Sequence, residues 1–448
     1  MKVLLPVLLL LATSAFAEGR PRPLTEQDAK AGRAVFQREC AACHGERGDG
    51  NGPGAAFVDP KPRNFTKKLF KLRTTASGEA PATADILRTI ERGIPGSAMP
   101  SFSFLSEQER RQVAAVVLDF ADLLDQPEPA PIKEPGAPPA PGPQSVAKGK
   151  QVYEAQGCAA CHGTGGKGDG PAAKTLADDD GNAIKVRDFT TGVYRGGADR
   201  RDLYYRFTTG LDGTPMPAFA DSINDADRWA LVDYIKSLEV KPPPQPLPRD
   251  AIAAGRAVAA KYSCRACHVL DDGKGGSAGP DLRISGQKLD SDWVRGFVQA
   301  PREKGKIYPW RTARMPHLGV TAEEADAVAR YLAAMGKREV GPAGKPPPGS
   351  FVQAKVDAGQ LLFMVRCTEC HNLGHVVETP LIKQQGPDLI NVAGRVDYGW
   401  ARKWILDPQK VYPGTKMTVP GLTPEEVDAV RMFVWKTSME AQGKLAAK

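Results

Sequence analysis

Four copies of one five-residue motif constrain this chain more than any other feature. The motif is C-x-x-C-H, and its copies begin at Cys40, Cys158, Cys264 and Cys367. Two thiols at this spacing lie on one helical turn and can bond to the two vinyl groups of a porphyrin, and the next residue, histidine, then lies beneath the iron. A single copy would also fit a thioredoxin-like redox pair or half of a zinc site. All eight cysteines fall into the four motifs, so the sequence predicts four covalently bound haems c.

The motifs supply the predicted attachment and proximal iron ligands. The attachment cysteines are Cys40, Cys43, Cys158, Cys161, Cys264, Cys267, Cys367 and Cys370. The predicted proximal ligands are His44, His162, His268 and His371.

One methionine in a turn-like setting follows each motif, and we predict that it is the distal iron ligand. These residues are Met99, Met216, Met315 and Met417. A loop methionine can also simply fill a gap in the core. Thioether sulfur favours Fe(II) and raises the reduction potential relative to two histidines. In the third copy His317 follows Met315 by two residues and could compete for the iron.

Proline-rich stretches divide the chain into four segments with one motif each, which is an internal repeat. The predicted organisation is a signal peptide at 1–17, domains at 18–126, 144–240, 249–339 and 351–448, and linkers at 127–143, 241–248 and 340–350. The first linker favours an extended polyproline II spacer.

Each segment is expected to begin and end with an amphipathic helix. The first helices are predicted at 26–39, 145–156, 251–262 and 354–366, and the last at about 107–124, 225–238, 322–335 and 424–439. Each first helix contains a glycine, namely Gly32, Gly149, Gly255 or Gly359. Glycine inside a helix costs about 1 kcal/mol relative to alanine, so its recurrence predicts close packing of another backbone. Capping boxes are predicted at Thr321 and Thr423. The sequence therefore predicts an all-α fold with a crossed helix pair around each haem.

The N-terminus has the pattern of a cleaved signal peptide. Lys2 precedes an apolar run, and Ala15-Phe16-Ala17 follows it. The run is shorter than the roughly 20 residues that a membrane span needs. We therefore expect a periplasmic or otherwise exported protein with no transmembrane segment in the mature chain.

The formal net charge of +8 and the pI near 9.0 do not indicate a nucleic-acid partner. Four haems bring roughly eight propionates, which leave the loaded protein near neutral. Basic residues gather before the third and fourth distal methionines: Arg302, Lys304, Lys306, Arg311, Arg314, Lys403, Lys410 and Lys416. They could steer an acidic redox partner, or they could simply be a solvated face.

Each segment resembles a class I c-type cytochrome domain. The fourth carries Trp404-Ile405-Leu406-Asp407-Pro408 and a run from Tyr412 to Met417 that are similar to the mitochondrial-like form. The third and fourth share Gly-Pro-Asp-Leu at 279–282 and 386–389. The resemblance implies that this proline's carbonyl accepts a hydrogen bond from the proximal histidine. It also matches Trp293 and Trp404 to a tryptophan near a haem propionate, with core packing as the alternative.

The first two segments share Arg-Asn/Asp-Phe-Thr, beginning at Arg63 and Arg187. These arginines could offset a buried propionate or remain solvated.

With histidine and methionine on both axial positions, the iron has no open site. The resemblance thus implies four tandem cytochrome c-like domains that carry electrons between redox proteins, the electrons passing between the haems along the chain, without catalysis. The alternatives are a peroxidase-like haem enzyme with one open or displaced distal site, and a cytochrome subunit of a larger dehydrogenase or oxidase complex. The sequence identifies neither donor nor acceptor.

Overall fold

The computed structural model describes residues 24–132, 136–240, 246–301, 315–336, 346–347, 349–374, 386–413, 415 and 417–443. The predicted signal peptide and the basic run from Arg302 to Arg314 lie outside the described residues. Within the described ranges the chain forms α-helices, short 3-10 helices and isolated bridges but no strand, which confirms the predicted all-α class. None of these described helices has both the length and the apolar character required to cross a bilayer.

The helices form four units, which we call the first (24–132), second (136–240), third (246–336) and fourth (346–443). Each name refers only to the described residues within its range. Each unit is built on two packed helices, one before its C-x-x-C-H motif and one at its end. The pairs are α1 (Glu26–Glu39) with α4 (Glu107–Phe120), α5 (Pro143–Ala155) with α8 (Asp225–Ser237), α9 (Ala251–Lys261) with α13 (Ala322–Met335), and α14 (Gln353–Arg366) with α17 (Pro424–Ala441). The helices predicted at the two ends of each segment are therefore present.

The recurring glycine lies where the two helices of each pair cross. A Cβ atom on Gly149 would lie 1.9 Å from the carbonyl oxygen of Ala230, and one on Gly359 would lie 2.0 Å from that of Ala429. A Cβ atom on Gly32 would lie 2.3 Å from the carbonyl oxygen of Gln112, and one on Gly255 would lie 2.1 Å from the side chain of Tyr331. The predicted close packing is confirmed, because no larger residue fits at these crossings.

Capping boxes fix where several of these helices begin. Thr321 and Glu324 form one at α13, and Thr423 and Glu426 form one at α17, as predicted. Each box satisfies backbone N–H groups that a helix start leaves without partners.

Shorter helices lie between the two long ones of each unit. They are α2 (Ala41–His44), η1 (Ala55–Phe57), η2 (Phe65–Lys67), α3 (Thr83–Arg92), α6 (Ala159–His162), η3 (Ala173–Thr175), η4 (Phe189–Thr191), α7 (Arg200–Thr209), η5 (Cys264–Ala266), α10 (Leu282–Lys288), α11 (Ser291–Gln299), α15 (Tyr398–Leu406) and α16 (Pro408–Val411). Among them, α3 packs on α4, α7 on α8, α11 on α13 and α15 on α17.

The start of the first proline-rich stretch packs on the first unit instead of running free as a spacer. The Glu128 carboxylate accepts hydrogen bonds from the backbone N–H of Thr83 at 3.0 Å and from its hydroxyl at 2.9 Å. The N–H of Ile132 donates to the carbonyl of Thr74 at 2.8 Å. These residues are therefore attached to the first unit, and the extended polyproline II conformation of the stretch stays a prediction.

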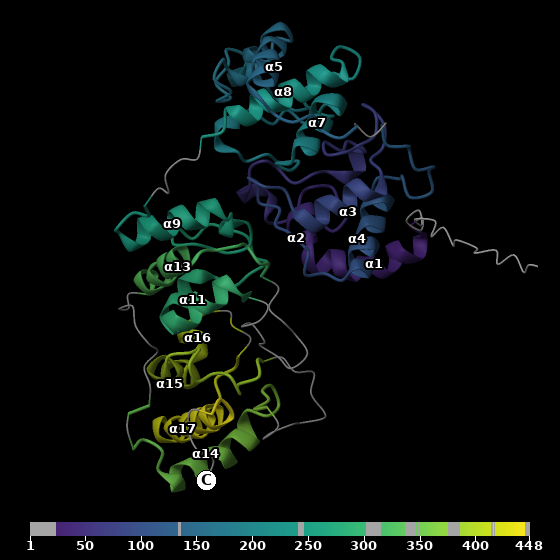
Figure 1. Ribbon diagram of the computed structural model, residues 1–448. Coiled ribbons are helices and arrows are strands. Elements are labelled where there is room, and N and C mark those ends of the chain that lie inside the picture. The colour runs from purple at the N-terminus through teal and green to yellow at the C-terminus, as the bar shows by residue number, and fades with distance from the viewer. Residues whose placement is uncertain are drawn as a thin grey trace, which may run out of the picture.

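The four units are arranged in space in an order that differs from their order in the sequence (Figure 1). The first unit contacts the second through Arg73 and Asp212, whose side chains form an ion pair. It contacts the third where η1 packs on η5. The third contacts the fourth through an antiparallel bridge between Leu289 and Val396. The units are thus linked in the order second, first, third, fourth.

Candidate haem-binding sites

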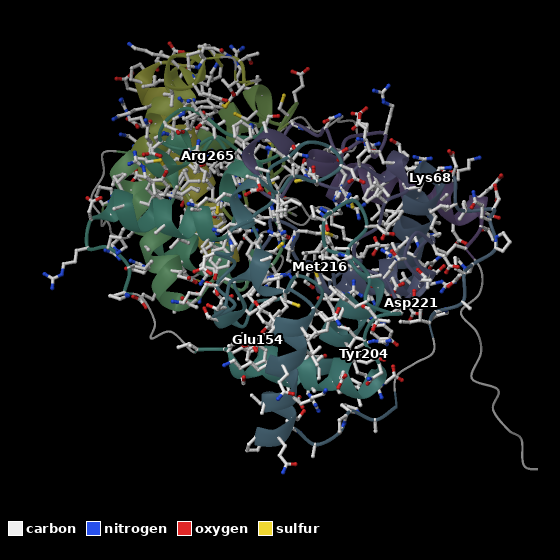
Figure 2. All side chains as sticks on the ribbon, turned by 90° about the horizontal axis from the view of Figure 1, so that it is seen from above. Lys68, Glu154, Tyr204, Met216, Asp221 and Arg265 are labelled. Atoms are coloured by element: carbon white, nitrogen blue, oxygen red, sulfur yellow. The ribbon has the colours of Figure 1, made fainter. Side chains whose placement is uncertain are left out.

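A continuous cavity of about 1310 Å³ runs through the first three units. In each unit its wall contains the motif histidine together with the predicted methionine. The pairs are His44 with Met99, His162 with Met216, and His268 with Met315. Figure 2 places Met216 near the middle of the molecule when it is viewed from above. The fold therefore places the two predicted axial ligands of each of these units on the wall of the same cavity.

The eight motif cysteines are all described, and none of them forms a disulfide. Burial is the main cause that raises the pKa of Cys40 to about 12 and that of Cys264 to about 11. These two thiols therefore lie in apolar surroundings, which suit thioether formation to a buried porphyrin better than they suit a reactive thiolate.

The proximal histidines of the first two units are oriented by backbone carbonyls. The Nδ1 atom of His44 lies 3.0 Å from the carbonyl oxygen of Arg63, and that of His162 lies 3.4 Å from the carbonyl oxygen of Arg187. A carbonyl can only accept, so Nδ1 carries the proton and Nε2 is left to bind a metal. Burial lowers the pKa of both histidines, which favours the neutral imidazole that metal binding requires.

The same short motif also packs against the imidazole. Phe65 stacks on His44 with ring centroids 4.7 Å apart, and Phe189 stacks on His162 at 4.4 Å. The residue before each phenylalanine, Asn64 or Asp188, caps the 3-10 helix that presents the ring. The Arg-Asn/Asp-Phe-Thr motif therefore supplies a carbonyl, a cap and a stacking ring. Sequence reasoning considered only the arginine side chain, although the recurrence of the whole motif was visible.

In the third and fourth units a proline carbonyl has the same role. The Nδ1 atoms of His268 and His371 each lie 2.8 Å from a carbonyl oxygen, that of Pro280 and Pro387 respectively. This is the contact that the resemblance implied. The glycine before each proline is required by space, since a Cβ atom on Gly279 would lie 2.4 Å from the imidazole of His268.

The cations that line the cavity in the first and second units include Arg63, Lys71, Arg187 and Arg195. Burial lowers the pKa of each arginine, and burial followed by the charge of Arg63 lowers the pKa of Lys71 to about 8. The buried Nε atom of Arg195 has no hydrogen-bond partner among the described residues. Anionic haem propionates would supply negative charge to these cations and a hydrogen-bond acceptor to Arg195. The residues present therefore fit a haem, and Lys71 and Arg195 are additions that the sequence did not suggest.

The third and fourth distal methionines differ in how well they are placed. Met315 lines the cavity and packs on the core of the third unit, whereas His317 is exposed. Met417 is half-buried, and its carbonyl accepts a hydrogen bond from Gln409 at 3.0 Å. Its neighbours Gly414 and Lys416 lie outside the described residues. Met315 therefore lies on the cavity wall in the third unit, whereas His317 is exposed. The position of Met417 relative to His371 stays a prediction.

The match of Trp293 with Trp404 is wrong by one helical turn. Trp293 and Trp400 each donate a backbone N–H to the aspartate that caps their helix, Asp290 at 2.7 Å and Asp397 at 2.6 Å. Trp400 in turn stacks on Trp404 at 5.1 Å. Trp400 is therefore the structural counterpart of Trp293, and the aromatic spacing of four residues in α15 caused the error.

The first and third motifs lie against each other. A Cβ atom on Gly54 would lie 2.4 Å from the carbonyl oxygen of Ala266, which is inside the third motif. Burial, and after it the nearby thiol of Cys267, raise the pKa of Cys43 to about 11. The attachment edges of these two sites thus meet, although a whole segment separates them in the sequence.

A family model described as cytochrome c matches residues 29–119, 146–239 and 252–336. The chain is 32% identical over 107 residues to cytochrome c2 of Rhodoblastus acidophilus, covering 19% of this chain and 94% of that protein. It is 28% identical over 217 residues to the Cbb3-type cytochrome c oxidase subunit CcoP of Azospirillum brasilense, covering 46% of this chain but only 61% of that subunit.

Among solved structures, a chain of the reducing HAO-like protein complex of Kuenenia stuttgartiensis is similar. The two are 44% identical, the match covers 49% of this chain and 99% of the other, and the TM-score is 0.46.

Proposed function

Because the chain belongs to the cytochrome c family and binds four haems c at its C-x-x-C-H motifs, we propose that it is an exported carrier that passes electrons between redox proteins. Its role in electron transfer follows from the family. The proposal adds that all four irons are closed to substrate, each by one histidine and one methionine. The observation that carries it is the cavity wall, which contains a motif histidine and a predicted methionine in each of three units.

The proposed ligand sets are one pair per unit: His44 with Met99, His162 with Met216, His268 with Met315, and His371 with Met417. Bound haem supplies the Fe(III)/Fe(II) couple. The paired cysteines hold the porphyrin by two thioether bonds. The carbonyls of Arg63, Arg187, Pro280 and Pro387 keep each imidazole in one orientation. Apolar walls exclude water, which favours the less charged reduced state.

The cations of the cavity wall have a separate role. Arg63, Lys71, Arg187 and Arg195 would pair with propionates at the contact of the first and second units. Paired in this way, the buried charges cost less than they do alone. The proposed sites therefore also stabilise the contact between units.

Membership of a larger complex is the second candidate. It is supported by the similarity to an oxidase subunit, of which this chain covers 61%. In that case the partner would be another subunit of the complex, and the ligand sets would be the same. An acidic docking surface on the partner is a further proposal, based on the basic residues before the third and fourth methionines. Of these, Lys403 and Lys410 are described and exposed.

Carbon monoxide binding tests whether the sites are closed. Ferrous iron with an open position binds this gas and changes its absorption spectrum, whereas iron with two strong axial ligands does not. The reduced protein at neutral pH should therefore show no spectral change under carbon monoxide. A shift in about one quarter of the haem absorbance would instead support the peroxidase-like alternative, with one open or displaced distal site.

A further inference from the structure

The contact between the third and fourth units has the same local structure on both sides. The N–H of Asp290 donates to the carbonyl of Arg395 at 2.9 Å, and the N–H of Asp397 donates to the carbonyl of Lys288 at 2.7 Å. Each aspartate caps a helix, α11 or α15. Lys288 and Arg395 both precede their capping aspartate by two residues, so they occupy equivalent places around a local two-fold relation.

Each of these two cations reaches across the contact. The guanidinium carbon of Arg395 lies 5.8 Å from the ring centroid of Trp293 in the third unit. The Nζ atom of Lys288 lies 5.8 Å from the ring centroid of Trp400 in the fourth. Cations at this distance from an aromatic face are attracted to it. Each unit therefore contributes one cation that contacts a tryptophan ring of the other unit.

Arg395 is also part of the wall of the third haem site. It lines the cavity together with Lys288, Trp293, His268 and Met315, and among the described residues of the fourth unit it is the one that does so. The site that carries the third motif is thus completed by a side chain from the next unit.

Lys288 and Arg395 together favour the binding of an anion at this contact. Burial, and after it the positive charge of Arg395, lower the pKa of Lys288 to about 8. An anion that binds close to two like charges away from water lowers their mutual repulsion. A haem c carries two propionate carboxylates, and arginine binds carboxylates through two parallel hydrogen bonds.

We propose that the fourth unit supplies Arg395 to the third haem, where Arg395 and Lys288 together hold the propionates and raise that haem's reduction potential. A nearby positive charge favours the added electron, because Coulomb attraction is strong where water is excluded. The potential of the third haem then depends on the presence of the fourth unit. This inference rests on the proposed function, since it requires a haem held at Cys264, Cys267 and His268.

A potentiometric titration of the full-length, haem-loaded Arg395→Gln variant tests the inference. One of the four midpoint potentials, that of the third haem, should fall by an amount equal to about a tenfold change in its Fe(II)/Fe(III) ratio, or about 59 mV for a one-electron couple. The third haem is identified as the one whose potential moves in Met315→His. Lys288→Gln should lower the same potential, and Arg395→Lys should restore most of it.

Arg402→Gln is the matched control, because Arg402 is a cation of α15 that pairs with Asp428 at 2.9 Å. It should leave all four potentials unchanged. Unmoved potentials in both Arg395→Gln and Lys288→Gln would overturn the inference. So would a fall confined to the fourth haem, which would mean that Arg395 serves its own unit. A haem count below four in the unaltered protein contradicts the proposed function, whereas four haems with unmoved potentials contradict only this role of Arg395.

Discussion

The guanidinium of Arg73 in the first unit donates from Nη2 to the Asp212 carboxylate of the second unit at 2.7 Å, and its side chain is fully buried. The same Nη2 atom donates to the carbonyl of Thr209 at 2.9 Å. Arg206 of the second unit returns the contact by donating to the carbonyls of Lys71 at 3.0 Å and Arg73 at 2.5 Å. Two arginines thus join the first two units through several hydrogen bonds, which fixes how their haem sites face each other.

Arg73→Met should lower the free energy of unfolding of these two units by about 3 kcal/mol. The substitution fills much of the volume but removes the cationic partner of Asp212 and the Nη2 donor of the Thr209 carbonyl, and breaking a buried pair in this way is costly. Arg88→Met is the control, since Arg88 is 38% exposed and lies 3.9 Å from Asp202. It should cost less than about 1 kcal/mol. Chemical denaturation followed by circular dichroism measures both changes in the free energy of unfolding. Equal changes would show that the buried Arg73 contact stabilises the protein no more than the exposed Arg88 pair does.

Gly54→Val should separate the first motif from the third. The backbone of Gly54 has φ −84°, which any residue adopts, so the cost arises from crowding, mainly against the Ala266 carbonyl oxygen at 2.4 Å and less against that of Ala42 at 3.1 Å. Overpacking of this kind costs about 1–3 kcal/mol, and amide exchange at residues 264–268 should become about tenfold faster or more. Gly136→Val is the control, because a Cβ atom there meets nothing within 4 Å. Unchanged exchange in Gly54→Val would argue against the contact.

The pattern in the sequence predicted the helix pairs because their apolar residues and glycines repeat in every segment. It missed α3 and α7, and for α7 the reason lies in the contact between units. Asp202 of α7 is buried, and Arg88 and Arg92 of the first unit pair with it. Residues of this kind have the composition of a solvated surface. Only the docking of two units, which no local pattern encodes, makes them part of the interior.

The acid stability of the third unit should depend on Glu324. Burial alone would raise the pKa of its carboxyl, but hydrogen bonds from Lys261 at 2.5 Å, from the hydroxyl of Tyr262 at 2.7 Å and from the N–H of Thr321 at 2.9 Å lower it to about 2. A lowered pKa stabilises the folded state above the ordinary value of 4.5, and this contribution is lost as the pH falls toward 2. Glu324→Gln should therefore be less stable at pH 6 and approach the unaltered protein near pH 2.

Thermal unfolding at several pH values measures this difference. The exposed neighbour Glu323, replaced by glutamine, should behave like the unaltered protein throughout. A gap between Glu324→Gln and the unaltered protein that stays constant from pH 6 to pH 2 would contradict the assigned role.

The ligand of the third iron can be decided by two alanine variants. Met315 lines the cavity, so Met315→Ala should remove one of the four methionine ligands and weaken the near-infrared band of methionine-to-iron charge transfer by about a quarter. His317 is exposed, so His317→Ala should leave the band unchanged. An unchanged band in Met315→Ala would show that Met315 is not the ligand and that His317 or another group binds the third iron.

The candidate sites were predictable only in part: the sequence indicated the ligand side chains, but not the backbone carbonyls that orient them. Cysteine, histidine and methionine stand out in a sequence because few residue types bind iron. The carbonyls of Arg63 and Arg187 do not, since every residue has one and only the fold decides which lies beside an imidazole. The same is true of Arg395, whose place at the third haem site depends on how the fourth unit packs.

A reductive titration of the oxidised protein, with absorbance recorded at each addition under anaerobic conditions, tests the central claim most directly. The claim is that one chain holds four haems whose irons all cycle between Fe(III) and Fe(II) in closed sites. The titration should take up four electrons per chain, with low-spin spectra at both ends. An uptake of fewer than four electrons, or a high-spin fraction that persists in the reduced protein, would contradict it.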